Sequence, residues 1–214
     1  MKIKITKKTL KNKRFSFNAM AFTPKEQNDA KKNWALFTHG YTASKSDCLN
    51  WAQRLVDNNI PTVIFDLPGH YLGSFNEVDS FSDFSEHAHE CFEDAFSLLQ
   101  ELVKTPCKSL ILGGHSLGAL LSIKALDLKS FEAFEKTAIA VGLGISDHKT
   151  THLFESSFYQ KTLELRRQLV SSTIDSDYVF PWIKEQKSNM VIRDKKIHLI
   201  CGKDDVVVGQ NGAK

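Results

Sequence analysis

Long apolar runs are missing from this sequence of 214 residues. No stretch approaches the roughly 18 consecutive apolar residues that a membrane-spanning helix needs. The basic residues 1–10 are not followed by the apolar segment of a secretory signal. The net charge is also small, since 28 Lys and Arg oppose 25 Asp and Glu to give +3. We therefore expect a protein without a membrane span and without a nucleic-acid partner.

Cysteine is scarce, and the sequence contains no CxxC pair or other metal-ligand spacing. Without a secretory signal we expect no disulfide framework, and we predict isolated, buried thiols in a cytoplasmic protein. The segment Gly142-Leu143-Gly144 lacks the third glycine of a dinucleotide-binding loop. We accordingly expect no metal and no cofactor. The four cysteines are Cys48, Cys91, Cys107 and Cys201.

Short apolar runs alternate with longer amphipathic stretches along the chain. Hydrophobic residues make up 42% and charged residues 25%, which is enough apolar material for the core of one domain. The alternation predicts an α/β fold with a mostly parallel sheet and helices on both faces. The predicted strands are residues 15–23, 34–38, 61–65, 110–112, 137–143 and 197–201.

The intervening stretches carry helix signals. Ser44 with Asp47 and Ser80 with Asp83 each have the spacing of a capping box, in which two side chains cap a helix start. The first pair predicts a helix ending at residues 58–59. The second predicts one continuous amphipathic helix that Pro106 ends.

Residues 145–195 form an unusually long connection between the last two predicted strands. A crossover needs only about a dozen residues, so we predict a helical cap inserted into a core of residues 1–144 and 196–214. Its aromatic residues could line an apolar pocket or simply pack the cap onto the core. They are Phe154, Phe158, Tyr159, Tyr178, Phe180 and Trp182.

The strongest chemical signal is Gly114-His115-Ser116-Leu117-Gly118, directly between a predicted strand and a predicted helix. Glycines on both sides of Ser116 remove the Cβ atoms that would clash with strand and helix. A serine on such a tight turn exposes its hydroxyl at the carboxyl edge of the sheet, with a helix N-terminus beneath it. An ordinary glycine-rich turn remains the alternative.

Four segments in this order resemble the α/β-hydrolase family, particularly its small esterases and monoacylglycerol-lipase-like members. They are residues 37–42 (Phe-Thr-His-Gly-Tyr-Thr), 66–70 (Asp-Leu-Pro-Gly-His), 114–119 (Gly-His-Ser-Leu-Gly-Ala) and 201–207 (Cys-Gly-Lys-Asp-Asp-Val-Val). The resemblance implies the α/β-hydrolase fold and a serine nucleophile. It also implies structural roles for His39 and for residues 66–70.

Carried over to this sequence, the resemblance makes Ser116 the nucleophile, which needs a positioned base. The backbone N–H groups of Tyr41 and Leu117 would form the oxyanion hole. Asp205 would be the catalytic acid. Asp204 ranks second for that role, and Asp147 is a reserve candidate.

The catalytic histidine of the family follows the acid, but all eight histidines here precede Asp205. The last strand and helix of the fold are also missing, so we expect the chain to be truncated at its C-terminal end. A rescue by His148 or His152 is the weaker alternative. The histidines are His39, His70, His87, His89, His115, His148, His152 and His198.

Together these features predict a hydrolase that cleaves small carboxylic esters with short-to-medium acyl groups through an acyl-enzyme on Ser116. A thioesterase or peptidase would use the same residues. A binding module of the same fold that lacks its base is the alternative outside enzyme chemistry. The oligomeric state stays open.

Overall fold

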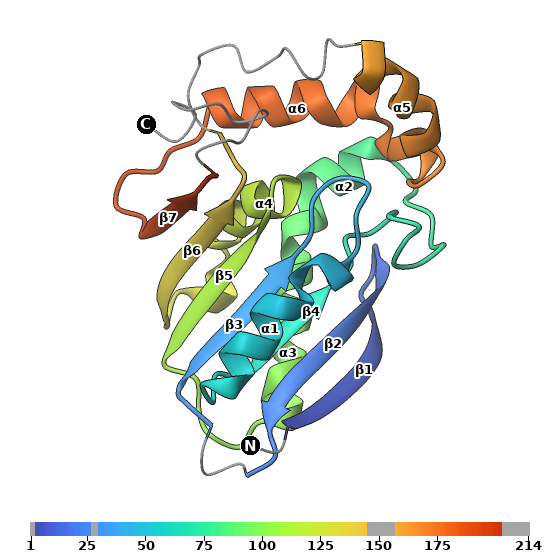
Figure 1. Cartoon of the computed structure of the whole chain (residues 1–214). Coiled ribbons are helices and arrows are strands. Elements are labelled where there is room, and N and C mark those ends of the chain that lie inside the picture. Colours follow the sequence, from blue (N-terminus) through green and yellow to red (C-terminus); the bar gives the residue numbers. More distant parts are fainter. Residues whose placement is uncertain (1–2, 27–29, 145–156, 203–214) are drawn as a thin grey trace.

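The computed structural model describes residues 3–26, 30–144 and 157–202, and within these ranges seven strands form one sheet. The strand order is β1-β2-β4-β3-β5-β6-β7 (Figure 1). β1 and β2 pair antiparallel, as do β2 and β4, and the remaining neighbours are parallel. The strands are β1 (Ile3–Lys11), β2 (Ser16–Pro24), β3 (Asn33–Thr38), β4 (Thr62–Phe65), β5 (Ser109–His115), β6 (Glu135–Val141) and β7 (Ile197–Ile200). The predicted mostly parallel α/β sheet is confirmed.

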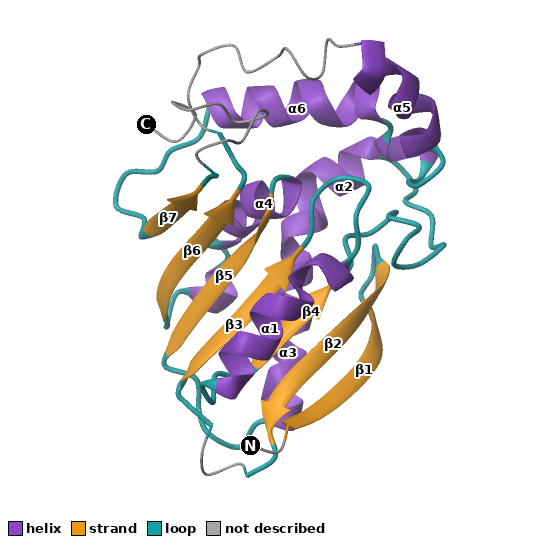
Figure 2. Ribbon diagram, viewed as in Figure 1, coloured by secondary structure: helices purple, strands orange, loops and turns teal. Residues whose placement is uncertain are grey.

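Helices cover both faces of this sheet, as Figure 2 shows. α1 packs on one face, and α3 and α4 pack on the other. α5 and α6 lie above the carboxyl ends of the parallel strands. The helices are α1 (Leu49–Asp57), α2 (Phe81–His87), α3 (Cys91–Leu102), α4 (Leu117–Ala125), α5 (Ser157–Arg167) and α6 (Ser176–Ser188). None of the helices in the described ranges combines the length and apolarity needed to cross a bilayer.

The central part of β3, residues 34–37, is continuously apolar. Trp34 and Leu36 belong to the core beneath α3 and α4, whereas Ala35 and Phe37 belong to the core beneath α1. Successive side chains of a strand point to opposite faces. Because both faces are covered, the positions from Trp34 to Phe37 are all apolar.

β1 was not predicted, because its nine residues include four lysines and lack a clear alternation. Tertiary pairing decides its conformation, since β2 pairs with it along its whole length, from Ile3 opposite Pro24 to Lys11 opposite Ser16. β1 is an edge strand of the sheet. Exposed lysines on an edge strand disfavour pairing with a further chain.

The two predicted capping boxes have different outcomes. The Ser80 hydroxyl accepts a hydrogen bond from the Asp83 N–H at 3.0 Å, which confirms the start of α2. The capping box predicted at Ser44 is wrong, because the Ser44 hydroxyl bonds the Ser46 hydroxyl and caps no backbone N–H. The Asp66 carboxylate instead accepts the Lys45 N–H at 2.8 Å. A short 3₁₀ helix, Lys45–Cys48, therefore precedes α1.

Two further predictions need correction. The single helix expected after Ser80 is divided into α2 and α3 by a 3₁₀ turn, Ala88–Glu90. The four cysteines, all within the described residues, form no disulfide, but only Cys48 and Cys91 are buried, whereas Cys107 and Cys201 are partly exposed.

Candidate active site

Ser116 lies on the tight turn between β5 and α4, with φ 50° and ψ −110°. Positive φ is rare for a residue with a side chain, and such strain gathers at functional sites. Ser116 is partly exposed, and its N–H donates to the Val141 carbonyl at 2.8 Å. The structure thus places the predicted serine on the strained turn that the sequence indicated.

The two glycines beside Ser116 are required by close backbone packing. A Cβ atom on Gly114 would lie 2.6 Å from the Thr38 carbonyl oxygen, and one on Gly118 would lie 2.5 Å from the His39 carbonyl oxygen. The turn that carries Ser116 therefore interlocks with the end of β3. As a result, residues 39–43 lie beside the serine turn.

His39 organises this neighbouring loop. Its Nε2 accepts the Leu67 N–H at 2.8 Å, so the ring proton is on Nδ1 and donates to the Gly40 carbonyl at 2.8 Å. Burial lowers the pKa of His39 from 6.5 to about 4. A neutral ring with both nitrogens occupied is a structural group, in line with the role implied by the resemblance.

The same contacts orient the Gly40–Tyr41 peptide. The Gly40 carbonyl accepts hydrogen bonds from His39 Nδ1 and, at 3.2 Å, from the Ala43 N–H. In a trans peptide the following N–H points away from the carbonyl, so these two bonds set the direction of the Tyr41 N–H. Leu117 is the first residue of α4, where the helix supplies no acceptor for its N–H.

Several predicted site residues lie outside the described residues. These are the acid candidates Asp205, Asp204 and Asp147 and the rescue candidates His148 and His152. Within the described ranges, no histidine nitrogen forms a hydrogen bond with the Ser116 hydroxyl. The structure therefore brings together Ser116, Leu117 and the Tyr41 loop, without describing a base or an acid beside them.

The other described histidines near the core have structural environments. Burial lowers the pKa of His70 to about 3, and its Nδ1 bonds the Pro68 carbonyl at 3.0 Å. His87 pairs with Glu90 at 2.9 Å. His89 is partly buried, and burial lowers its pKa to about 4.

Three consecutive elements above the sheet contact the Tyr41 loop. Arg166 on α5 donates to the Thr42 hydroxyl at 2.9 Å. The Tyr41 hydroxyl donates to the carbonyl of Ile174, in a short 3₁₀ turn before α6, at 3.1 Å. The Phe180 ring on α6 meets the Tyr41 ring edge-on at 5.3 Å. Nothing in the sequence spacing indicated these contacts.

Two aromatic residues of α6 contact the rings of α2. Tyr178 and Trp182 contact Phe81, and Trp182 also contacts Phe84. Of the two alternatives, packing onto the core describes Trp182, which is 8% exposed, whereas Tyr178 is 56% exposed. Phe154 and the side chains of Phe158 and Tyr159 lie outside what the structure describes.

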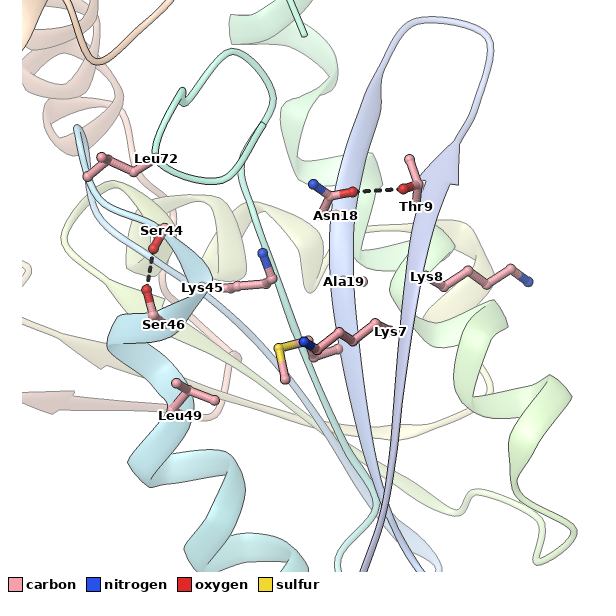
Figure 3. A pocket seen from close by; sticks show the side chains of 11 residues that line it. Lys7, Lys8, Thr9, Asn18, Ala19, Ser44, Lys45, Ser46, Leu49 and Leu72 are labelled. Carbon is pink, nitrogen blue, oxygen red and sulfur yellow. Dashed lines mark hydrogen bonds between the residues drawn. The ribbon is translucent and has the colours of Figure 1, made fainter. Parts of the chain in front are cut away.

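A hollow of about 460 Å³ lies elsewhere, between β1, β2 and the start of α1 (Figure 3). It is lined by none of the predicted site residues. Two of its lysines are already engaged, Lys8 with Glu101 at 2.6 Å and Lys45 with Asp66 at 2.5 Å. We therefore assign the candidate site to the Ser116 turn and not to this hollow.

A strained serine turn after a central parallel strand, covered by helices at the carboxyl edge, defines the chain as a hydrolase of α/β type. A family model described as the alpha/beta hydrolase family matches residues 35–187. The chain therefore belongs to the alpha/beta hydrolase family. No curated protein matches its sequence significantly.

Solved structures with low sequence identity share the fold. A soluble variant of monoglyceride lipase from Saccharomyces cerevisiae is 14% identical, with a TM-score of 0.64 over 93% of this chain and 77% of that one. A fungal esterase from Rhizomucor miehei is 13% identical, with a TM-score of 0.59 over 94% and 74%. A thermostable carboxyl esterase from Bacillus coagulans is 12% identical, with a TM-score of 0.51 over 92% and 68%.

Proposed function

We propose that the protein is a serine hydrolase that cleaves small carboxylic esters with short-to-medium acyl groups. The observation that carries the proposal is Ser116 at positive φ, interlocked through Gly114 and Gly118 with the loop that presents Tyr41. The esterases and the monoglyceride lipase among the similar structures support an ester over a thioester or an amide.

In the proposed reaction the Ser116 oxygen attacks the ester carbonyl carbon, and a general base takes its proton. The negative charge that forms on the carbonyl oxygen accepts hydrogen bonds from the N–H groups of Tyr41 and Leu117. The alcohol leaves with a proton, and water then hydrolyses the acyl-Ser116 ester. We assign Asp205 the orientation of the histidine that serves as base.

The proposal extends to the rest of the chain. Residues 145–195 act as the cap over the site, on a core of residues 1–144 and 196–214. The substrate is a small molecule in the cytoplasm, and no nucleic acid, metal or cofactor takes part.

The first prediction concerns Ser116. A fluorophosphonate probe should label the protein as its gene encodes it, and Ser116→Ala should abolish both labelling and hydrolysis of a short-chain nitrophenyl ester. The expected loss in kcat is about 10⁴-fold or more, because the nucleophile and its base act as a unit. Labelling is read by intact-protein mass spectrometry.

Ser97→Ala is the matched control, since Ser97 is exposed on α3 and bonds only the Glu93 carbonyl. It should label as the unchanged protein does. A folded protein that neither binds the probe nor turns over esters would contradict the proposal and support a binding module. Faster cleavage of a thioester or an anilide would instead reassign the substrate class.

A further inference from the structure

Thr42 occupies a backbone conformation that its side chain disfavours. It has φ 61° and is the third residue of the turn in which the Ala43 N–H donates to the Gly40 carbonyl. That turn position normally takes glycine or asparagine when φ is positive. For a β-branched residue the conformation is strained, so it persists only where surrounding contacts hold it.

The Thr42 hydroxyl is bound on both sides. Its proton goes to the Tyr41 carbonyl at 2.7 Å, and it accepts a hydrogen bond from Arg166 Nη1 at 2.9 Å. A hydroxyl has one proton and two acceptor lone pairs, so both bonds form at once. The bond from the guanidinium carries a charge and is the stronger kind.

These two bonds hold the middle peptide of the turn. A flip of the Tyr41–Thr42 peptide would relieve the positive φ of Thr42, but it would turn the Tyr41 carbonyl away from the Thr42 hydroxyl. The hydroxyl would then lose its acceptor, and the flip would disturb the turn bond from the Ala43 N–H to the Gly40 carbonyl, which helps to set the direction of the Tyr41 N–H. Arg166 opposes this flip by fixing the rotamer of Thr42, which is only 8% exposed.

We propose that Arg166 is a positioning residue that acts through Thr42 to hold the turn presenting the Tyr41 N–H. This inference rests on the proposed function for its catalytic consequence. α5 then does more than cover the site, because it keeps the oxyanion-hole turn in its strained form. Arg166 itself touches neither the ester nor Ser116 in this role.

The test is a double-mutant cycle on the protein as its gene encodes it. Arg166→Ala should lower kcat about tenfold or more with KM nearly unchanged, since a misplaced oxyanion donor affects the transition state more than substrate binding. Arg166→Lys should recover part of the loss. In a Thr42→Val background, which lacks the hydroxyl, Arg166→Ala should have no further effect.

Arg167→Ala is the matched control, because Arg167 is the next residue on α5 and pairs with Asp175 and Asp177 instead of the turn. It should leave kcat unchanged. An equal loss in Arg167→Ala, additive losses in the cycle, or a rise in KM at constant kcat would overturn the proposal. The last result would make Arg166 a substrate-binding residue.

A readout independent of activity separates this proposal from the proposed function. Amide hydrogen exchange of residues 41–43 should accelerate at least about tenfold in Arg166→Ala but not in Arg167→Ala, because opening of the turn becomes easier. Unchanged exchange would overturn the positioning role even in an active enzyme. Accelerated exchange in a protein that fails to label at Ser116 would retain the contact and reject only the ester chemistry.

Discussion

At the scale of single residues, the serine turn depends on the lack of a side chain at Gly118. The Gly118 Cβ position lies 2.5 Å from the His39 carbonyl oxygen and 2.7 Å from the Thr38 carbonyl oxygen. These neighbours are backbone atoms of the sheet and its loop, so they cannot move aside as a flexible side chain would. The conformation of Ser116 and the position of the Tyr41 loop therefore both depend on this glycine.

Gly118→Ala should accordingly lower the free energy of unfolding by about 2 kcal/mol or more, because overpacking a rigid contact costs roughly 1–3 kcal/mol. Urea unfolding followed by circular dichroism measures the change. Ser122→Ala on the same helix is the control, since that hydroxyl bonds only the Ala119 carbonyl one turn earlier. If both variants unfold at the same urea concentration, the close contact does not constrain the turn.

At the scale of elements, Asp66 ties the end of β4 to the start of the α1 segment. Its carboxylate is fully buried and accepts both the backbone N–H of Lys45 at 2.8 Å and the Lys45 ammonium at 2.5 Å. The bond from the Lys45 N–H caps the start of this helical segment, a role predicted from the sequence for Ser44. Lys45 and Asp66 are 21 positions apart in the chain, and only folding brings them together.

Asp66→Asn should lower the free energy of unfolding by about 3 kcal/mol, because it leaves the Lys45 ammonium without its buried partner. Lys8→Gln removes a comparable pair with Glu101 at the surface and should cost about 0.5 kcal/mol, since exposed pairs contribute little. Chemical denaturation of both variants provides the comparison. Equal losses would mean that burial does not strengthen the Asp66 pair.

At the scale of the whole molecule, two neutral histidines lie in the core where the loops after β3 and β4 meet. The rings of His39 and His70 are 5.1 Å apart, and burial is the main reason that their pKa values fall to about 4 and about 3. In the unfolded chain both histidines titrate near 6.5. Acid therefore favours the unfolded chain, which binds protons that the folded protein excludes.

The contribution of these histidines to the free energy of unfolding should be complete above pH 6.5. It should fall as the pH decreases from 6.5 toward 4. Each histidine contributes about 1.4 kcal/mol per pH unit in that window. Thermal unfolding between pH 6.5 and 5 measures the slope before most carboxylates titrate. His89 adds to this slope, because burial lowers its pKa to about 4 as well. His70→Gln should therefore reduce the slope by about a third, and a flat profile for the unchanged protein would exclude this origin of acid sensitivity.

The sequence by itself determined the strands with continuous apolar runs, the Ser80 cap and the serine turn, because these depend on residues close together in the chain. The position of Ser116 on a tight turn was predicted from that local information, whereas the roles of Leu117 and Tyr41 came from the resemblance to the α/β-hydrolase family. Asp205 stays a prediction, as does the cytoplasmic location.

Tertiary structure alone decided β1, the carboxylate that replaces the Ser44 cap, and the Arg166 contact on Thr42. The last of these joins residues 124 positions apart. Local spacing carries no record of such a pair, since either residue would suit many surfaces. Only the packing of α5 over the carboxyl ends of the strands brings the guanidinium to the strained turn.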